Sequence, residues 1–251
     1  MPVARNYGLS WIDNDALFEV SRKAFAKSFQ KANAPFDPEE SKNAIDPFNA
    51  LLLMGATGRG YQAWVQSERE RQFGKTLQNA TGNWHQTVLG LAPRWKNKGS
   101  NGGVFDIEST EPVLGFGSEP YMSVHVIAEV KNKYNTIKAS DERETHRKLE
   151  DQAKSRGKDT VAYLIQIIPD KKQRYNKPWV PSGARESNRV YVMDGHTAYD
   201  LVFEYPDALK ELYLALPHII NDVLVAEGFS ATDLSADAEE ISALFGATFG
   251  R

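Results

Sequence analysis

One short segment constrains the fold of this chain more than any other. Thr160–Ile168 is nearly continuous apolar sequence, which is typical of a β-strand buried on both faces of a sheet. Residues 141–156 before it predict a helix, with Asp141 as the N-cap and Glu144 three residues further on, as in a capping box. Residues 124–130 predict an earlier strand. A strand, a helix and a strand in this order indicate a right-handed crossover.

The rest of the chain divides into helical ends and a middle that forms a sheet. Apolar residues recur at helical spacing near the N-terminus, and glycines interrupt the second helical region. The pattern changes to strands after a glycine-rich loop and returns to helices beyond Asp194. The expected helices cover 13–32, 48–91 with an interruption at 55–60 and possible breaks at Gly74 and Gly82, and the region from 194 to the end; the further strands cover 104–107 and 113–116, and the loops 96–103 and 171–189.

The length of 251 residues fits one domain with small appendages. We expect a single domain over 1–251, with a mainly helical part over 1–95, a sheet core with a functional loop over 96–193 and a helical part over 194–251. The expected fold class is α/β, a mixed central sheet flanked by helices. The absence of cysteine excludes disulfides, thiolate zinc sites and a cysteine nucleophile. No apolar run approaches the roughly 20 residues that cross a bilayer and no export signal is seen, so we expect a cytoplasmic protein.

Charge is unevenly distributed, although the net charge is only −3. Residues 1–128 hold equal numbers of basic and acidic side chains, residues 129–193 carry a basic excess, and residues 194–251 are strongly acidic. A basic middle part could face phosphate groups while an acidic tail keeps the protein in solution. Uneven charge also arises without any function, so this pattern supports nucleic-acid binding only mildly.

Three residues form the chemical centre of the sequence. Asp106 lies on the first expected strand of the sheet, and Glu129 and Lys131 close a later apolar strand, where residues two apart project to the same face. Two carboxylates on neighbouring strands can hold Mg²⁺, and a lysine beside them can orient or deprotonate an attacking water. An isolated Glu-x-Lys is usually an ion pair at a strand end. The apolar strand, the upstream aspartate and the later buried strand together favour a nuclease core of the PD-(D/E)xK type.

Longer motifs strengthen this interpretation. The segments 129–136, 75–79 with 84–86, and 168–169 with 174–178 resemble Type II restriction endonucleases, and within them the SinI/AvaII-like group that cuts GGNCC or GGWCC sites. The resemblance covers about 45–195 and thins in the acidic C-terminal part. It implies a Mg²⁺-dependent homodimer that cuts double-stranded DNA in a short palindromic site, leaves 5′-phosphates and has a cognate DNA methyltransferase. It also implies that Asp106 and Glu129 are metal ligands and that Lys131 is the catalytic lysine.

Further residues are candidates for roles around this centre. Gln86 lies on the helix before the sheet, where related nucleases often place a polar residue near the metal; a surface glutamine is the alternative. Glu108 points to the same strand face as Asp106 and is a possible additional ligand. Arginine, lysine and asparagine contact phosphates and bases, so two loops are expected to bind DNA. The expected DNA-contacting residues are Lys133, Asn135, Thr136, Arg174, Tyr175, Asn176 and Lys177.

Other signals and functions fit less well. Gly74-Lys75-Thr76 resembles the end of a phosphate-binding loop but lacks the glycine that this motif needs five positions earlier, and the five histidines have no metal-ligand spacing. Two alternatives remain for the function: a PD-(D/E)xK nuclease of other specificity, acting in repair or on particular DNA structures, and a DNA-binding module without catalysis. The sequence does not locate the interface of a homodimer: the N-terminal helices and the Leu209 to Val225 helix are both candidates, and either could equally be core.

Overall fold

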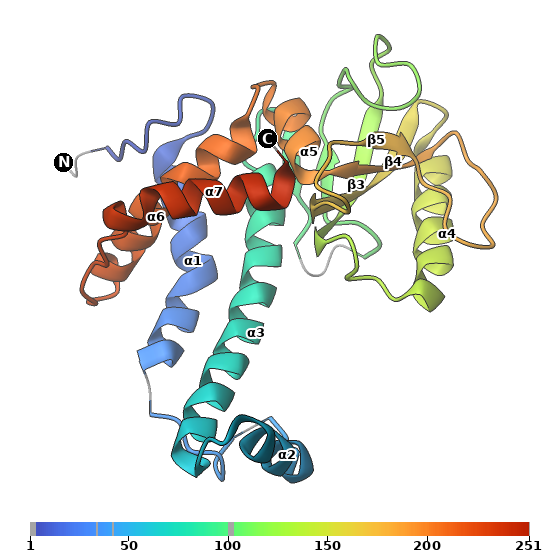
Figure 1. Cartoon of the computed structure of the whole chain (residues 1–251). Helices are drawn as coiled ribbons and strands as arrows, with labels where there is room; N and C mark the ends of the chain where they lie inside the picture. Colours follow the sequence, from blue (N-terminus) through green and yellow to red (C-terminus); the bar gives the residue numbers. More distant parts are fainter. Residues whose placement is uncertain (1–3, 34, 42, 100–102, 251) are drawn as a thin grey trace.

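The computed structural model describes residues 4–33, 35–41, 43–99 and 103–250. It contains a mixed six-stranded sheet with helices on both faces and helical segments at both ends of the chain, which confirms the expected fold class at this level (Figure 1). Residues 100–102 of the expected glycine-rich loop lie outside the described residues. The strands are β1 Trp95–Asn97, β2 Ile107–Ser109, β3 His125–Lys133, β4 Thr160–Ile168, β5 Asn176–Pro178 and β6 Val190–Asp194, in the sheet order β1-β2-β3-β4-β6-β5.

The centre of the sheet is parallel and its edges are antiparallel. β3, β4 and β6 run parallel, whereas β1 and β2 on one side and β5 on the other pair antiparallel with their neighbours. β4 lies between β3 and β6, and seven of its nine residues are buried, all except Gln166 and Ile168. The predicted two-sided burial of this strand is therefore confirmed.

Each face of the sheet is covered by different helices. α4 (Ala139–Arg156) packs against β4 and β6 on one face, where Leu149 and Ala153 join Ile127, Ala162 and Leu164 in a small apolar core. The opposite face carries a larger core that includes Trp84, Val88, Ala128, Tyr163 and Tyr199. The helices of the larger core are α1 Asn14–Asn33, α3 Tyr61–Leu89, α5 Gly195–Phe203, α6 Ala208–Ala226 and α7 Ala238–Phe249.

α1 and α3 also extend away from the sheet as an arm. α3 has 29 residues and contacts β3 and β1 near its C-terminal end, while α2 (Pro47–Thr57) packs near its N-terminal end (Figure 1). The arm places α2 far from β3, β4 and α4. Gly74 and Gly82 do not break α3, which continues through both. The packing of the other residues of the helix compensates for the low helix propensity of glycine.

Several expectations about the elements were wrong in detail. α4 begins at Ala139 with Lys138 as the N-cap, so Asp141 lies in the first turn, where its charge suits the helix dipole. Residues 113–116 form only an isolated bridge between Val113 and Val124. β1, β5 and β6 were not expected, because strands of three to five residues are too short for a recognisable pattern; β5 lies within the segment 171–189 that was expected to be a loop.

Candidate active site

Asp106 and Glu129 lie opposite each other where β2 begins beside β3. Ile107 pairs with Ala128, and the Asp106 amide donates a hydrogen bond of 2.9 Å to the carbonyl of Ala128. This register places the Asp106 side chain opposite Glu129. Asp106 Oδ2 also accepts a hydrogen bond of 2.8 Å from the Val130 amide, which fixes the carboxylate beside β3.

Glu129 and Lys131 project from β3 to the face that α4 covers. Side chains alternate between the two faces along a strand, so Ala128 and Val130 point into the larger core on the other face. Lys131 Nζ donates to Glu129 Oε1 in a close ion pair, and both side chains are largely shielded from solvent. The predicted Asp106, Glu129 and Lys131 set is thus brought together at one point of the sheet; its catalytic role remains a prediction.

The two carboxylates repel each other. Burial and the negative charge of Glu129 raise the pKa of Asp106 to about 7, although the Val130 amide and the charge of Lys131 act in the opposite direction. A divalent cation between such carboxylates would relieve this repulsion, and a hard, oxygen-ligated ion such as Mg²⁺ fits this donor set. The described residues contain no cluster of three or more histidine, aspartate or glutamate side chains suited to a metal. A site with two carboxylates suits Mg²⁺, which keeps waters and takes oxygens from a phosphate.

Glu108, the weaker candidate ligand, has a different environment. Its carboxylate forms ion pairs with Lys96 Nζ at 2.8 Å, Lys98 Nζ at 3.4 Å and Arg156 at 3.7 Å. Burial acts to raise its pKa, but the hydrogen bond and charge of Lys96, with help from Lys98, hold the pKa of Glu108 below its usual value. This carboxylate is already neutralised by protein cations, so it is poorly suited to a metal.

Gln86 lies on the other side of the sheet. It belongs to the turn of α3 between Gly82 and Gly90, and a Cβ atom at these two glycines would lie 3.7 Å from Asn132 Cβ and 2.7 Å from Asn97 Cβ. This face of α3 therefore lies over the β1 to β3 part of the sheet. Gln86 is half-buried; its carbonyl accepts from the Gly90 amide at 3.1 Å, and its side chain forms no hydrogen bond with the residues that the structure describes. Its expected place near the metal remains a prediction.

A row of polar side chains continues from Lys131 across the sheet. Lys131 pairs in register with Gln166 of β4, and Gln166 pairs with Asp194 of β6. Tyr175 is bonded to two members of this row: its hydroxyl donates to Gln166 Oε1 at 2.6 Å, and its amide donates to Asp194 Oδ2 at 2.6 Å. Gln166 Nε2 in turn donates to the carbonyl of Tyr134 at 3.1 Å. The row connects both expected DNA-binding loops to β3.

Sequence reasoning did not identify Gln166 and Asp194 in this row. A signal existed for each: Gln166 interrupts an otherwise apolar strand, and Asp194 stands at the N-cap of α5, where its carboxylate accepts from the Thr197 amide at 3.0 Å. Gly195 follows because its α-carbon passes directly over β4, and a Cβ there would lie 2.4 Å from the carbonyl oxygen of Ile167.

The first expected DNA-binding loop leaves the sheet two residues after Lys131. Lys133 and Asn135 are exposed, and Thr136 closes the turn by donating from Oγ1 to the Lys133 carbonyl at 2.7 Å. The Tyr134 amide donates to the carbonyl of Ile168 at 3.0 Å, which holds the loop against β4. These side chains stand beside the candidate active site and face solvent.

The second expected loop is less uniform. Arg174 is held by Asp200 at 2.6 Å, by Asp207 at 3.0 Å and by His196 at 2.9 Å, so it would have to leave these partners to contact DNA. The exposed Asn176 accepts from the Tyr163 hydroxyl at 3.2 Å. Lys177 is exposed on the edge strand β5, with its Nζ 5.6 Å from the centre of the Tyr175 ring. Contact of these residues with DNA remains a prediction.

Some of the basic side chains in residues 129–193 form ion pairs within α4. Arg147 pairs with Asp151, Lys148 with Glu144 and Lys154 with Glu150, each one turn apart on the exposed face of the helix. These pairs stabilise the helix surface and leave less positive charge for a ligand.

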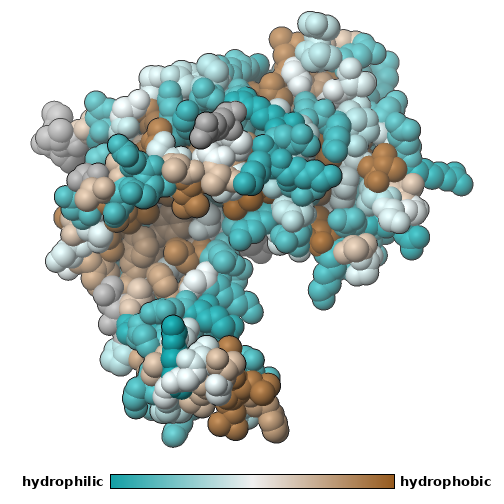
Figure 2. All heavy atoms as spheres, in the orientation of Figure 1, coloured by the Kyte–Doolittle hydropathy of each residue, from teal (hydrophilic) through white to brown (hydrophobic). Residues whose placement is uncertain are grey.

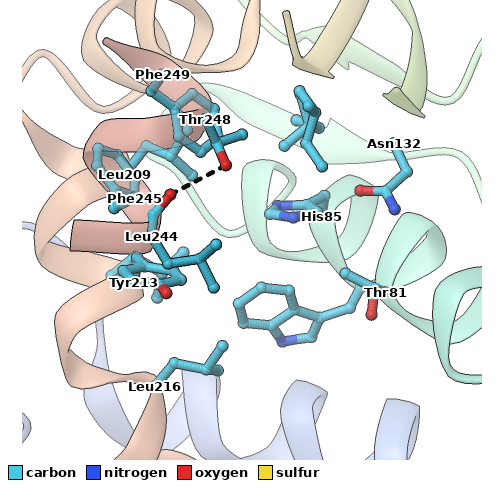
Figure 3. Close-up of a pocket in the computed structure, with 14 residues that line it drawn as sticks. Thr81, His85, Asn132, Leu209, Tyr213, Leu216, Leu244, Phe245, Thr248 and Phe249 are labelled. Carbon is cyan, nitrogen blue, oxygen red and sulfur yellow. Dashed lines mark hydrogen bonds between the residues drawn. The ribbon is translucent and has the colours of Figure 1, made fainter. Parts of the chain in front are cut away.

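An apolar cavity of about 310 Å³ lies away from Asp106, Glu129 and Lys131. Figure 3 shows it between α3, α6 and α7, with Asn132 reaching it from β3 and Tyr213, Leu244 and Phe245 opposite. Asn132 follows Lys131 on β3 and therefore points to the other face of the sheet. The walls are mainly apolar. Their histidine, His85, is buried and its Nδ1 lies 2.8 Å from the Tyr199 hydroxyl, and the walls hold no carboxylate, lysine or arginine for phosphodiester chemistry.

Comparisons with known proteins test the enzyme class that the sequence predicts. None of the helices in the described part of the chain is long and apolar enough to span a membrane. A family model described as Eco47II restriction endonuclease matches residues 9–225. The Type II restriction enzyme Eco47II of Escherichia coli is 34% identical over 238 residues, covering 90% of this chain and 93% of the relative, and the Type II restriction enzyme Sau96I of Staphylococcus aureus is 28% identical over 229 residues, covering 86% and 81%. These matches confirm the enzyme class expected from the sequence, and the chain belongs to the Eco47II restriction endonuclease family.

Proposed function

We propose that the protein is a Mg²⁺-dependent Type II deoxyribonuclease that cuts both strands of a short palindromic DNA site and leaves 5′-phosphates. The recognition sequence that we propose is GGNCC or GGWCC, from the likeness of the motifs to enzymes that cut these sites. The observation that carries the proposal is the meeting of Asp106, Glu129 and Lys131 where β2 begins beside β3. Family membership supports the same enzyme class.

The residues of the site divide the work of hydrolysis. Asp106 and Glu129 would hold magnesium, which when bound supplies positive charge to the phosphate and lowers the pKa of water. Lys131 stands beside Glu129, where its ammonium group can orient the attacking water and stabilise charge that develops on the phosphoryl oxygens. The attacking water loses a proton to solvent as its oxygen forms a bond to phosphorus. The bond from phosphorus to the 3′ oxygen breaks, and that oxygen takes up a proton from solvent and leaves as a 3′-hydroxyl.

The two loops would bind the DNA around this centre. Lys133 and Lys177 are exposed and form no ion pair with the described residues, so both can contact phosphates. Asn135 and Asn176 carry amide groups that can read base edges in a groove. Tyr175 is fixed by Gln166 and Asp194, so it would position the second loop relative to the catalytic strand.

The symmetry of a palindromic site sets the proposed assembly. Two subunits related by a two-fold axis present one active site to each strand, so we propose a homodimer. A cognate methyltransferase would protect the host DNA, and the enzyme would act in the bacterial cytoplasm, where that DNA lies; both relatives come from bacteria.

The test is cleavage of unmethylated phage DNA with magnesium or with EDTA, followed by sequencing of the fragment ends. The Asp106→Asn variant is the matched control, because it keeps the shape of the side chain. Discrete fragments that require magnesium and end at GGNCC or GGWCC support the proposal and identify the central base. Smeared products would contradict a restriction role, and binding without any cutting would contradict catalysis.

A further inference from the structure

The end of the arm carries a helix whose exposed side is almost entirely apolar. Phe48 is 79% exposed, Leu51 67% and Leu52 72%, and Leu53 and Tyr61 beside them are about half exposed. Figure 2 shows the resulting hydrophobic cluster at the lower end of the molecule, over α2. Among the residues of α2, all of which the structure describes, Ala50 alone is buried. A large exposed apolar cluster of this kind usually marks an interface.

α2 is a defined helix despite its weak packing. Asp46 caps its first turn by accepting from the amides of Phe48 at 2.9 Å and Asn49 at 3.1 Å, Pro47 occupies the first turn, and Gly58 ends the helix with a φ of 65°. A helix of 11 residues is marginally stable by itself in water. The sequence therefore specifies both ends of a helix whose apolar side still lacks a covering surface in the single chain.

The composition of this surface selects the kind of partner. α2 contains no charged residue, so it offers nothing to the phosphates of DNA, and it lacks the basic side chains with which interfacial helices bind anionic lipids. An uncharged apolar surface is complementary to a second copy of itself across a two-fold axis, because no like charges meet there. The exposed side chains amount to roughly 500 Å² on each copy, of the same order as the ~800 Å² per partner of a stable interface.

We infer that α2 and the N-terminal end of α3 form the dimer interface, with α2 of one copy packed against α2 of the other. This inference rests on the proposed function, which requires a two-fold assembly. The arm holds α2 far from β3 and β4, so this contact leaves Asp106, Glu129 and Lys131 uncovered (Figure 1).

The first test is the mass of the protein in solution without DNA or magnesium. We expect the wild type to have twice the 28.1 kDa mass of one chain, and Leu52→Glu to have the mass of one chain. Val225→Glu is the matched control, since Val225 is 60% exposed on α6, and this variant should remain a dimer. A wild type of single-chain mass, or a Leu52→Glu variant that stays a dimer, overturns the inference.

A second test does not depend on disrupting the fold. The chain has no cysteine, so Phe48→Cys, Leu51→Cys and Leu52→Cys each introduce one thiol on α2, with Val225→Cys as the control. Oxidation should give a disulfide-linked dimer for at least one α2 variant and none for the control; linkage at no α2 position overturns the inference. A wild-type dimer that cuts DNA into discrete fragments but forms no link through α2 would refute the interface alone, and an α2-linked dimer that cuts no DNA would refute the proposed function alone.

Discussion

Two carboxylates on one strand face, two residues apart, have opposite surroundings. Glu108 is ringed by Lys96, Lys98 and Arg156, which hold its pKa below the usual value. Asp106 faces the carboxylate of Glu129, and burial and this neighbour raise its pKa to about 7. The protein has neutralised one carboxylate with its own cations and left the other with an excess of negative charge. The difference identifies the place that a metal cation would complete.

The largest expected effect separates these two carboxylates by activity. Asp106→Asn and Glu129→Gln each remove a proposed metal ligand and should lower the cleavage rate at least ~10³-fold, because metal stabilisation of the transition state amounts to several kcal/mol. Glu108→Gln should leave the rate within several-fold of wild type. Cleavage of a labelled duplex under single-turnover conditions measures all three. Equal losses from Asp106→Asn and Glu108→Gln would break the comparison.

Lysine variants test the cations in the same way. Lys131→Ala should lower the cleavage rate on the order of 10² to 10³-fold while folding and specific DNA binding remain largely intact, because the group acts on the water and the developing charge. Lys96→Ala removes a cation from Glu108 and should change the rate little. Gel-shift affinity and cleavage rate are measured on the same duplex, and near-normal cutting by Lys131→Ala would refute its catalytic role.

Stability should change in opposite directions at the two carboxylates. At pH 8 Asp106→Asn removes a charge that repels Glu129 and keeps an oxygen for the Val130 amide, so the free energy of unfolding without metal should rise by about 1–2 kcal/mol. Glu108→Gln loses solvent-screened ion pairs and should lower it by about 1 kcal/mol. Urea unfolding measures both, and the same sign in both variants would contradict the assignment.

This stability difference should shrink as the pH falls from 8 to 4. The folded pKa of Asp106 is raised, so the destabilisation is full above about pH 7, shrinks as the pH falls below that value and is gone below the pKa of this carboxyl in the unfolded chain. The folded pKa of Glu108 is lowered, so its contribution is present above the pKa of the unfolded chain and is lost as the pH falls. Urea unfolding of Asp106→Asn, Glu108→Gln and the wild type over this pH range checks the prediction. Differences in the free energy of unfolding that stay constant with pH would contradict it.

The smallest effect concerns the polar row beyond Lys131. Tyr175→Phe removes the hydrogen bond to Gln166 and should lower kcat/KM for cleavage by about fivefold, as expected for one bond of ~1 kcal/mol. A larger change in KM than in kcat would mark Tyr175 as a positioning residue of the DNA-binding loop. Tyr121→Phe, at a fully surface-exposed tyrosine, is the control. Equal effects of the two variants would remove the proposed link between loop and strand.

The chemical centre could be predicted because its signals are local in the sequence. The alternation of β3 places Glu129 and Lys131 on one face, and the apolar run of β4 requires a sheet covered on both sides. Asp106 was predicted from its place on an expected strand over 104–107; β2 begins one residue later, at Ile107, but the Asp106 amide still bonds the Ala128 carbonyl of β3.

The rest of the site depends on pairing between distant segments. Gln166 meets Tyr175 only because β5 returns to the edge of β6, and three-residue strands leave no periodic signal. The partners of Arg174 come from α5 and the turn before α6, which its own neighbours in the sequence do not indicate. The exposure of α2 was likewise hidden, because an apolar helix reads the same whether it is covered or not.

The most direct measurement is the stabilisation of the folded protein by magnesium. Thermal unfolding is followed with and without the ion for the wild type, Asp106→Asn and Glu108→Gln, because a ligand that binds only the folded state raises the melting temperature. Magnesium should stabilise the wild type and Glu108→Gln alike and leave Asp106→Asn unchanged. A shift that survives in Asp106→Asn and disappears in Glu108→Gln would contradict the account.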